Sequence, residues 1–256
     1  MLAKLEHKVR KKLMQLLRDN VAQIGNAVRC EAGTDEAHVY VYDMIDPYWG
    51  VSAEAFVKAM AGITAPTVHL HINSPGGDVF EARAMATAIA GSQSRVIAHI
   101  DGVAASAATY VALAAAEVRM SEGALFMIHN AWTLAYGNAD ELRQSAGLLD
   151  KIDATIVADY VRKTGKSDKT VVDWMSAETW FTAAEALDAG FIDAITAVDQ
   201  PDAASAKASM WNLSAFDRAP NLPEPPARPL VDDAAVLAQA QRNRNRLAML
   251  AGREMA

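Results

Sequence analysis

The sequence has a single cysteine, Cys30, among its 256 residues, so no disulfide bond can form within the chain. A single cysteine gives no indication that the protein works in an oxidising compartment. The sequence also lacks an uninterrupted apolar run of about 18 residues, the length that a membrane-spanning helix needs. Charged residues occur throughout the N-terminal stretch, where a secretory signal would be apolar. We therefore expect a soluble cytoplasmic protein with no membrane partner.

An excess of basic residues is also missing. The formal net charge is -7 at pH 7 and the isoelectric point is about 5.4, whereas binding to nucleic-acid phosphates normally requires a basic surface. We therefore expect no nucleic-acid partner. With 52% hydrophobic residues, the chain can bury a full core, and its length suits one domain of about 200 residues with appendages.

Phosphate-binding sequence motifs are absent as well. Gly76 and Gly77 follow a predicted strand over 67–73 and precede a predicted helix over 79–90. They lack the lysine of a P-loop and the spacing of a dinucleotide-binding loop, so we expect no nucleotide and no cofactor. The turn is either a simple connection or a place where backbone N–H groups face an anion or oxyanion.

Metal-ligand spacing is missing too. His69 and His71 project to the same face of their predicted strand. No third ligand occurs at a useful spacing from them, so we interpret the pair as packing residues and expect no metal site.

Alternating strand and helix patterns predict an α/β fold with right-handed βαβ units and a largely parallel sheet. The predicted strands cover residues 38–44, 67–73, 95–100, 118–120, 124–129 and 191–195. The first predicted helix opens at Ser52 and runs to residue 60. The other predicted helices cover residues 79–90, 107–115, 140–164, 169–175 and 183–189. The long helix over 140–164 ends at Gly165 and could lean away from the sheet.

The patterns divide the chain into four regions. Residues 1–36 are expected to form a basic amphipathic helical extension, and residues 37–199 the main domain. Five prolines between 220 and 229 favour an extended linker over 200–230. Residues 231–256 then contain a C-terminal helix.

Ser106 lies where a predicted strand turns into a helix, in the run DGVAASAA at residues 101–108. Small neighbours allow a sharp turn, and a helix N-terminus leaves N–H groups free near the hydroxyl, as in a nucleophile elbow. Taken alone, such a serine is more often a packed helix start or an N-cap. His129, at the end of a predicted strand, supplies the base that a serine nucleophile needs, and together they favour a catalytic pair.

Three ordered motifs resemble those of the ClpP-type serine peptidases. They are SPGG at residues 74–77, GVAAS at residues 102–106 and MIHN at residues 127–130. The runs IHNAW at 128–132 and YGNAD at 136–140 are most similar to ClpP-related head maturation proteases of tailed phages and prophages. The resemblance implies a crotonase-like α/β fold of repeated βαβ units with a long protruding helix, and subunits that assemble into a homo-oligomeric ring.

The same resemblance implies roles for individual residues. Ser106 would be the nucleophile and His129 the general base. The oxyanion hole would be formed by the N–H groups of Gly77 and Ala107, with Gly76 in the same turn.

The third member of the triad departs from the family pattern, because Glu178 stands where the family has an aspartate. A glutamate can also accept a bond from the imidazole, although its longer side chain alters the geometry. Asp173 is a nearby rival, and both acids could instead be surface residues. A Ser–Lys dyad that uses Lys151 is a further alternative.

We therefore expect a serine endopeptidase, a hydrolase that cleaves polypeptides through an acyl-enzyme. Its partners would be the scaffold, capsid or portal proteins of a viral prohead, in the host cytoplasm or inside the prohead. One alternative is a crotonase-type acyl-CoA enzyme, since that fold also uses glycine N–H groups to polarise a thioester. Another is a non-catalytic, capsid-associated scaffold protein that retains the fold.

Overall fold

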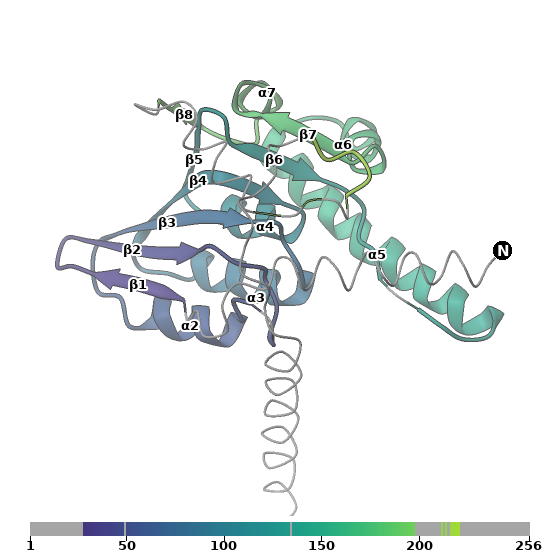
Figure 1. The fold of residues 1–256 in the computed structure, drawn as a ribbon, viewed down its shortest axis with the longest axis horizontal. Helices are drawn as coiled ribbons and strands as arrows, with labels where there is room; N and C mark the ends of the chain where they lie inside the picture. The colour runs from purple at the N-terminus through teal and green to yellow at the C-terminus, as the bar shows by residue number, and fades with distance from the viewer. Residues whose placement is uncertain are drawn as a thin grey trace, which may run out of the picture. The chain divides into compact units, whose positions relative to one another are not determined.

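Strands and helices alternate along the computed structural model, which describes residues 28–48, 50–133, 135–197, 211, 213 and 216–220. The strands are β1 (Arg29–Ala32), β2 (Glu36–Val41), β3 (Thr67–Ser74), β4 (Arg95–Ala105), β5 (Glu117–Ser121), β6 (Leu125–Ile128), β7 (Thr179–Thr182) and β8 (Ala194–Thr196). The helices are α2 (Ala53–Ala61), α3 (Val79–Ala90), α4 (Ala107–Leu113), α5 (Ala139–Thr164), α6 (Asp168–Ser176) and α7 (Ala183–Ala189). Figure 1 shows that α5 extends beyond the sheet, which confirms the predicted α/β fold with a long protruding helix.

The sheet is largely parallel, as the sequence predicts. Its main strand order is β1-β2-β3-β4-β5-β8, and the neighbours from β2 onward pair in parallel. Parallel neighbours need crossover connections, which α2, α3 and α4 provide between β2 and β5. Strand β5 pairs with the first half of β4, and β6 pairs with its last three residues. The C-terminal ends of β4 and β6 therefore lie side by side.

The helix ends follow the capping residues of the sequence. The side chains of Ser52, Asp78 and Thr182 accept hydrogen bonds from N–H groups in the first turns of α2, α3 and α7. Gly165 and Gly190 take the left-handed conformation after α5 and α7, with φ of 68° and 89°. These caps fix where each helix begins and ends relative to the sheet.

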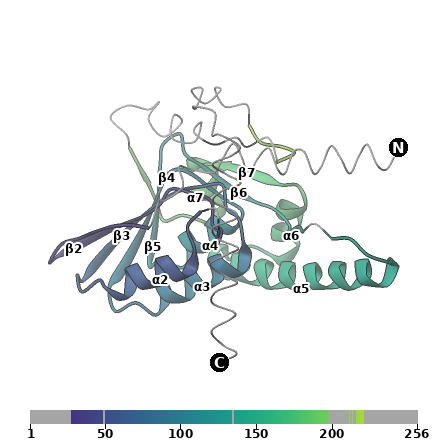
Figure 2. The same ribbon diagram turned by 60° about the horizontal axis from the view of Figure 1, so that its bottom comes forward.

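Each face of the sheet has its own cluster of buried side chains, because strand residues alternate between the two faces. On β3, Val68, Leu70 and Ile72 are fully buried in the main core. Figure 2 shows the helices α2, α3 and α5 on one side of the sheet. A smaller apolar cluster includes Val103 and Met127, which alternate with main-core residues on β4 and β6. This second cluster lies on the other face, close to the ends of those two strands.

The structure departs from the predicted elements at several strands. β1 lies within residues 1–36, which were expected to form a helical extension, and β7 was not predicted. Both are four-residue antiparallel strands, too short for a periodic pattern to stand out. β4 continues through Gly102 to Ala105, because pairing with β6 overrides the low strand propensity of these small residues. β8 is shorter than predicted, since Phe191 and Ile192 pack in the core before it.

The predicted regions at the two ends fall largely outside the described residues. Residues 1–27 of the helical extension expected over 1–36 are not described, nor is any part of the C-terminal helix expected within 231–256. The main domain expected from residue 37 includes β2, which begins at Glu36. In the range 200–230, expected to be an extended linker, Trp211 and Leu213 are only 4% and 5% exposed. The described part of that range is therefore packed on the domain, because its apolar side chains cover the second cluster.

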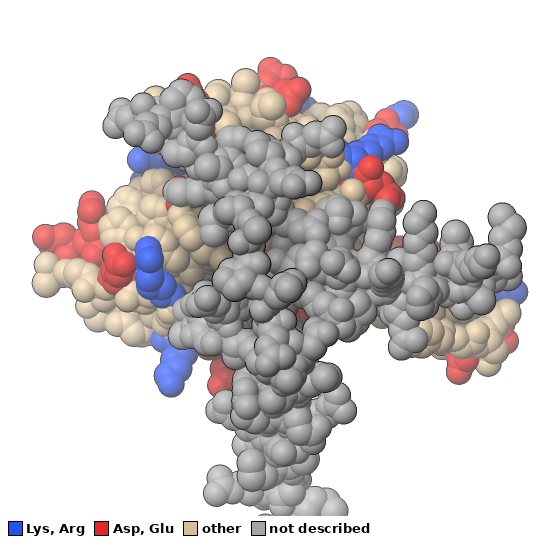
Figure 3. Space-filling model, in the orientation of Figure 1, with Lys and Arg blue, Asp and Glu red and all other residues tan. Residues whose placement is uncertain are grey.

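Among the residues that the structure describes, no helix is long and apolar enough to cross a membrane. On the face drawn in Figure 3, the described acidic and basic side chains are interspersed and form no continuous basic surface. This distribution agrees with the acidic balance of the sequence, whose net charge is -7.

Candidate active site

Ser106 occupies a sharp turn between β4 and α4. Its φ of 53° and ψ of -124° lie outside the regions that residues with a Cβ usually adopt. The turn is held by a 2.9 Å hydrogen bond from the Ser106 N–H to the Met127 carbonyl, and the Ser106 carbonyl accepts from the Thr109 N–H and hydroxyl. Backbone strain of this kind persists where the surrounding structure enforces it, and it is common at functional sites.

His129 follows β6 directly, next to the end of β4. The parallel register pairs Ala105 with Met127, so the residues just beyond the two strands approach each other. His129 Nε2 lies 2.8 Å from Ser106 Oγ. The loop after the histidine is fixed by α5, where Asp153 Oδ1 accepts a 2.7 Å hydrogen bond from the Ala131 N–H. The structure thus brings the predicted nucleophile and base into hydrogen-bonding contact.

The His129 imidazole is only partly open to solvent. Burial lowers its pKa below the ordinary value, and the negative charge of Glu178 acts in the opposite direction. The ring of Phe216 lies edge-on to it, with centroids 5.6 Å apart and planes at 76°. A neutral imidazole at neutral pH is the form that can accept a proton.

The turn at Gly76 and Gly77 lies directly against the serine elbow. A Cβ on Gly76 would come within 2.5 Å of the Ala105 carbonyl oxygen and 2.9 Å of the Ala107 nitrogen. The Gly76 N–H donates to the Ser74 hydroxyl at 3.1 Å. The N–H groups of Gly77 and Ala107, in contrast, donate to no acceptor among the described residues. Two free donors therefore flank Ser106, as an oxyanion hole requires.

Glu178 precedes β7 with a φ of 48° and does not bond to the imidazole directly. Its carboxylate accepts three hydrogen bonds, from the Trp180 indole at 3.2 Å and from the backbone N–H groups of Asp217 and Arg218 at 3.0 and 2.7 Å. Its influence on His129 is electrostatic.

The two rival residues lie elsewhere. Asp173 of α6 pairs with Lys169 at 2.6 Å, and its side chain is 62% exposed. Lys151 is exposed on α5. Of the two acids considered, Glu178 is the one whose charge acts on the histidine.

The hollow beside the serine is small. Its volume is about 10 Å³, and it is lined by Val79, Ser106, Ala107, Tyr110, His129, Ala131, Ile156 and Tyr160. This is about the space of one water molecule. A substrate side chain would therefore have to lie along the surface next to Ser106, or enter after the hollow opens.

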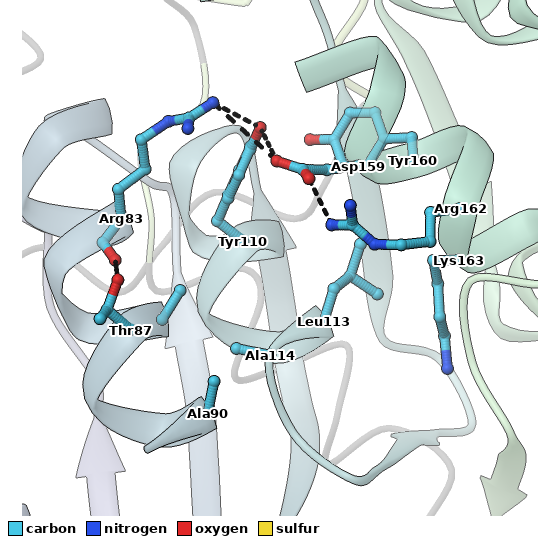
Figure 4. A pocket seen from close by; sticks show the side chains of 11 residues that line it. Arg83, Thr87, Ala90, Tyr110, Leu113, Ala114, Asp159, Tyr160, Arg162 and Lys163 are labelled. Atoms are coloured by element: carbon cyan, nitrogen blue, oxygen red, sulfur yellow. Dashed lines mark hydrogen bonds and ion pairs between the residues drawn. The ribbon is translucent and has the colours of Figure 1, made fainter. Parts of the chain in front are cut away.

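A larger cavity of about 500 Å³ lies between α3, α4 and α5. Figure 4 shows Arg83, Tyr110 and Asp159 turned toward one another in its wall. The Tyr110 hydroxyl donates to Asp159 at 2.9 Å and accepts from Arg83 at 3.2 Å, and Arg162 also pairs with Asp159. Asp159 therefore pairs with both arginines, and neither Ser106 nor His129 lines the cavity.

Four histidines form a separate cluster on the sheet face opposite the helices. His38 and His71 are joined at 3.1 Å and His69 and His99 at 2.9 Å, while His71 also contacts Asp101 at 3.0 Å. The sequence singled out only the two histidines of β3. The other two come from neighbouring strands by parallel register. No group among the described residues is arranged to hold a metal ion.

The sequence patterns did not predict that Trp211, Leu213 and Phe216, the described apolar residues of the segment 211–218, pack against the end of the sheet. A signal was present, because these large apolar residues occur in a stretch otherwise typical of a linker. Two aromatic residues as close together as Trp211 and Phe216 indicate a segment that packs against an apolar surface.

Comparison with known proteins matches residues 35–199 to the family model described as Clp protease. The ATP-dependent Clp protease proteolytic subunit of Streptococcus agalactiae is 30% identical over 140 residues, covering 50% of this chain and 67% of that protein. Proteolytic subunit 1 of Leifsonia xyli is 25% identical over 183 residues, covering 71% and 85%. A solved structure, that of a ClpP1 mutant from Listeria monocytogenes, has a TM-score of 0.57 at 22% identity, covering 63% of this chain and 92% of that one. The chain belongs to the Clp protease family.

Proposed function

We propose that this protein is a serine endopeptidase in which Ser106 is the nucleophile, His129 the general base and Glu178 the acidic member of the triad. The observation that supports this most directly is the 2.8 Å contact between Ser106 Oγ and His129 Nε2, at a sharp turn where Ser106 has a positive φ of 53°. Membership of the Clp protease family over residues 35–199 adds independent support.

Acylation begins when Ser106 Oγ attacks the carbonyl carbon of a peptide bond and His129 Nε2 takes the hydroxyl proton. The carbonyl oxygen becomes an oxyanion, which the N–H groups of Gly77 and Ala107 stabilise. Loss of one such donor typically costs about 100-fold or more in rate. The imidazolium then gives its proton to the leaving amine, and the C–N bond breaks to leave an ester on Ser106.

Deacylation repeats these steps with water as the nucleophile. His129 removes a proton from the water, the hydroxide adds to the ester carbonyl, and the proton passes to Ser106 Oγ as the ester bond breaks. Glu178 stabilises the imidazolium in both halves through its charge. The products are a carboxylic acid and the regenerated serine.

Labelling with a fluorophosphonate tests the assignment, because the reagent forms a covalent bond only with an activated serine. We expect the wild-type chain to be labelled at Ser106, and Ser106→Ala and His129→Ala to remain unlabelled. Equal labelling of Ser106→Ala would overturn the nucleophile assignment. Retention on immobilised coenzyme A without any labelling would favour the acyl-CoA enzyme instead.

We also propose that the substrates are polypeptides and that the protein acts as a homo-oligomeric ring. Both proposals follow from family membership. The hollow of about 10 Å³ next to Ser106 supports a substrate that lies along the surface as an extended chain. Size-exclusion chromatography with light scattering tests the ring, and a fluorogenic peptide library tests the substrate class. A monomer in solution would contradict the proposed ring.

A finer proposal concerns the biological substrate. The resemblance of residues 128–132 and 136–140 to phage and prophage head maturation proteases supports scaffold, capsid or portal proteins of a viral prohead. Co-expression with such proteins should yield shortened products with the wild-type chain and full-length ones with Ser106→Ala. Full-length products in both cases would contradict it. Mass spectrometry of the purified chain would show whether its own ends are trimmed in the same serine-dependent way.

A further inference from the structure

The Glu178 carboxylate is held by a part of the chain that lies beyond the family match, which ends at residue 199. The Arg218 N–H donates to Oε1 at 2.7 Å, and the Asp217 N–H donates to Oε2 at 3.0 Å. Both side chains point to solvent, so the segment offers its backbone to the glutamate. Hydrogen bonds to an ionised acceptor are stronger than neutral ones.

Two described residues of this segment are buried like residues of the core. Trp211 and Leu213 are 4% and 5% exposed and pack with Val103 and Met127 of β4 and β6. The Trp211 indole N–H donates to Asn73 Oδ1 at 3.2 Å. Burial of two such side chains contributes several kcal/mol, on the order of 2 kcal/mol each. Trp211 and Leu213 therefore pack as part of the folded domain.

Phe216, in the same segment as Trp211 and Leu213, packs against His129. Its ring lies 5.6 Å from the His129 ring and 5.6 Å from the Trp180 ring, edge-on to both. Aromatic pairs of this geometry restrict each other's orientation. The imidazole thus contacts both the Ser106 hydroxyl and the Phe216 ring.

We propose that residues 211–218 are a positioning element of the active site, in which Phe216 and the N–H groups of Asp217 and Arg218 orient His129 and Glu178. This inference rests on the proposed serine peptidase function. A glutamate in place of the family's aspartate has one more rotatable bond, so its carboxylate requires additional contacts to hold it in one position. Three donors on its carboxylate fix a side chain that would otherwise sample several rotamers.

Phe216 and the glutamate that the element holds affect the histidine in opposite directions. Burial lowers the pKa of His129, and the Phe216 ring covers part of the imidazole, whereas the charge of Glu178 raises this pKa. Removing the ring should therefore raise the pKa of His129. Displacing the glutamate should lower it. A segment that merely stabilised the fold would shift neither.

The experiment compares Arg218→Pro, which removes the N–H group, with Arg218→Ala, which removes only the exposed side chain. Fluorophosphonate labelling of Ser106 is followed in the full-length protein between pH 5 and pH 9. We expect Arg218→Pro to be labelled about tenfold more slowly than Arg218→Ala, since small displacements of catalytic groups are costly. We also expect the acidic limb of its pH profile to move to lower pH.

Phe216→Ala and Phe216→Leu provide a second test that does not alter the backbone. The alanine variant should move the acidic limb of the pH profile to higher pH. The leucine variant should move it less, because leucine still covers the His129 imidazole. Thermal melting of each variant identifies loss of fold, and if Arg218→Pro has unfolded, the two Phe216 variants decide.

Unchanged pH profiles in folded Arg218→Pro and in the Phe216 variants would overturn the proposal. Faster labelling of Arg218→Pro than of Arg218→Ala would also overturn it, in favour of a segment that restrains the site. These outcomes differ from failure of the proposed function, in which the wild-type protein itself is not labelled at Ser106.

Discussion

Gly76 and Ser106 are packed so closely that a Cβ on the glycine would lie 2.9 Å from the Cβ of the serine. Gly76 also has a φ of 91°, a conformation that residues with a side chain rarely adopt. The turn that carries the free Gly77 N–H and the elbow that carries the nucleophile therefore fix each other's position. Neither can be moved without disturbing the other.

Gly76→Ala should accordingly inactivate the protein. Its methyl group would meet backbone atoms of residues 105 and 107, which cannot rotate away, so the elbow must shift. We expect fluorophosphonate labelling of Ser106 to fall about 100-fold or more. We also expect the free energy of unfolding to fall by about 2 kcal/mol.

Gly147→Ala is the matched control, because a Cβ at this position on α5 meets no atom within 4 Å. Alanine in place of glycine inside a helix stabilises it by about 0.5–1 kcal/mol. Labelling should stay at the wild-type rate and the melting temperature should rise slightly. Wild-type labelling of Gly76→Ala would show that the turn and the elbow are not coupled.

Ser106 itself should be a source of strain. Its φ of 53° and ψ of -124° are unfavourable for a residue with a Cβ but accessible to glycine. We therefore expect Ser106→Gly to be more stable than Ser106→Ala by about 1 kcal/mol, after the flexibility that glycine adds to the unfolded chain. Both variants lack the nucleophile. Equal urea midpoints for the two would mean that the elbow is relaxed.

Substitution distinguishes Glu178 from Asp173 as the acidic member of the triad. In Glu178→Gln, an amide NH₂ replaces one acceptor oxygen, so a bond from Asp217 or Arg218 is lost together with the charge. We expect labelling to fall about 100-fold or more, as for other triads that lose their acid. Asp173→Asn should remain within about twofold of wild type, because its exposed pair with Lys169 contributes little. The reverse pattern would move the acid to Asp173.

The stability of the fold should decrease on mild acidification because of His99. Burial is the main cause that lowers its pKa to about 4, and the neighbouring charges that modify it are His71, His69, Asp101 and Arg119. An unfolded histidine titrates near 6.5. The unfolded chain therefore binds the proton first as pH falls, so stability is full above pH 6.5 and is lost progressively toward pH 4.

The loss amounts to at most about 3 kcal/mol for a group that is still partly hydrated. Urea unfolding at pH 7 and pH 5, at one protein concentration, measures about 2 kcal/mol of it, because pH 5 lies about 1.5 units below the unfolded pKa. His99→Gln should show a smaller difference between the two pH values than wild type. An equal difference in both proteins would place the acid sensitivity in another group.

The elements that the sequence predicted best are those with local physical signals. The helix α3 over Val79–Ala90 and the helix α7 over Ala183–Ala189 begin and end where their caps indicate. A capping side chain bonds within its own first turn, so its effect can be read from a few neighbouring residues. Short strands such as β1 and β7 have no comparable local signal, because their partners lie elsewhere in the chain.

The sequence by itself determined that Ser106, His129 and the Gly76–Gly77 turn occur at ends of strands, because strand and turn patterns are local. Only the tertiary structure decided that the serine and the histidine meet at 2.8 Å, since this contact depends on the pairing of β6 with the end of β4. It likewise decided that Glu178 is held by residues 217 and 218, some 40 positions away. Contacts between backbone N–H groups and a distant carboxylate leave no pattern in the sequence, because every residue except proline carries the same donor.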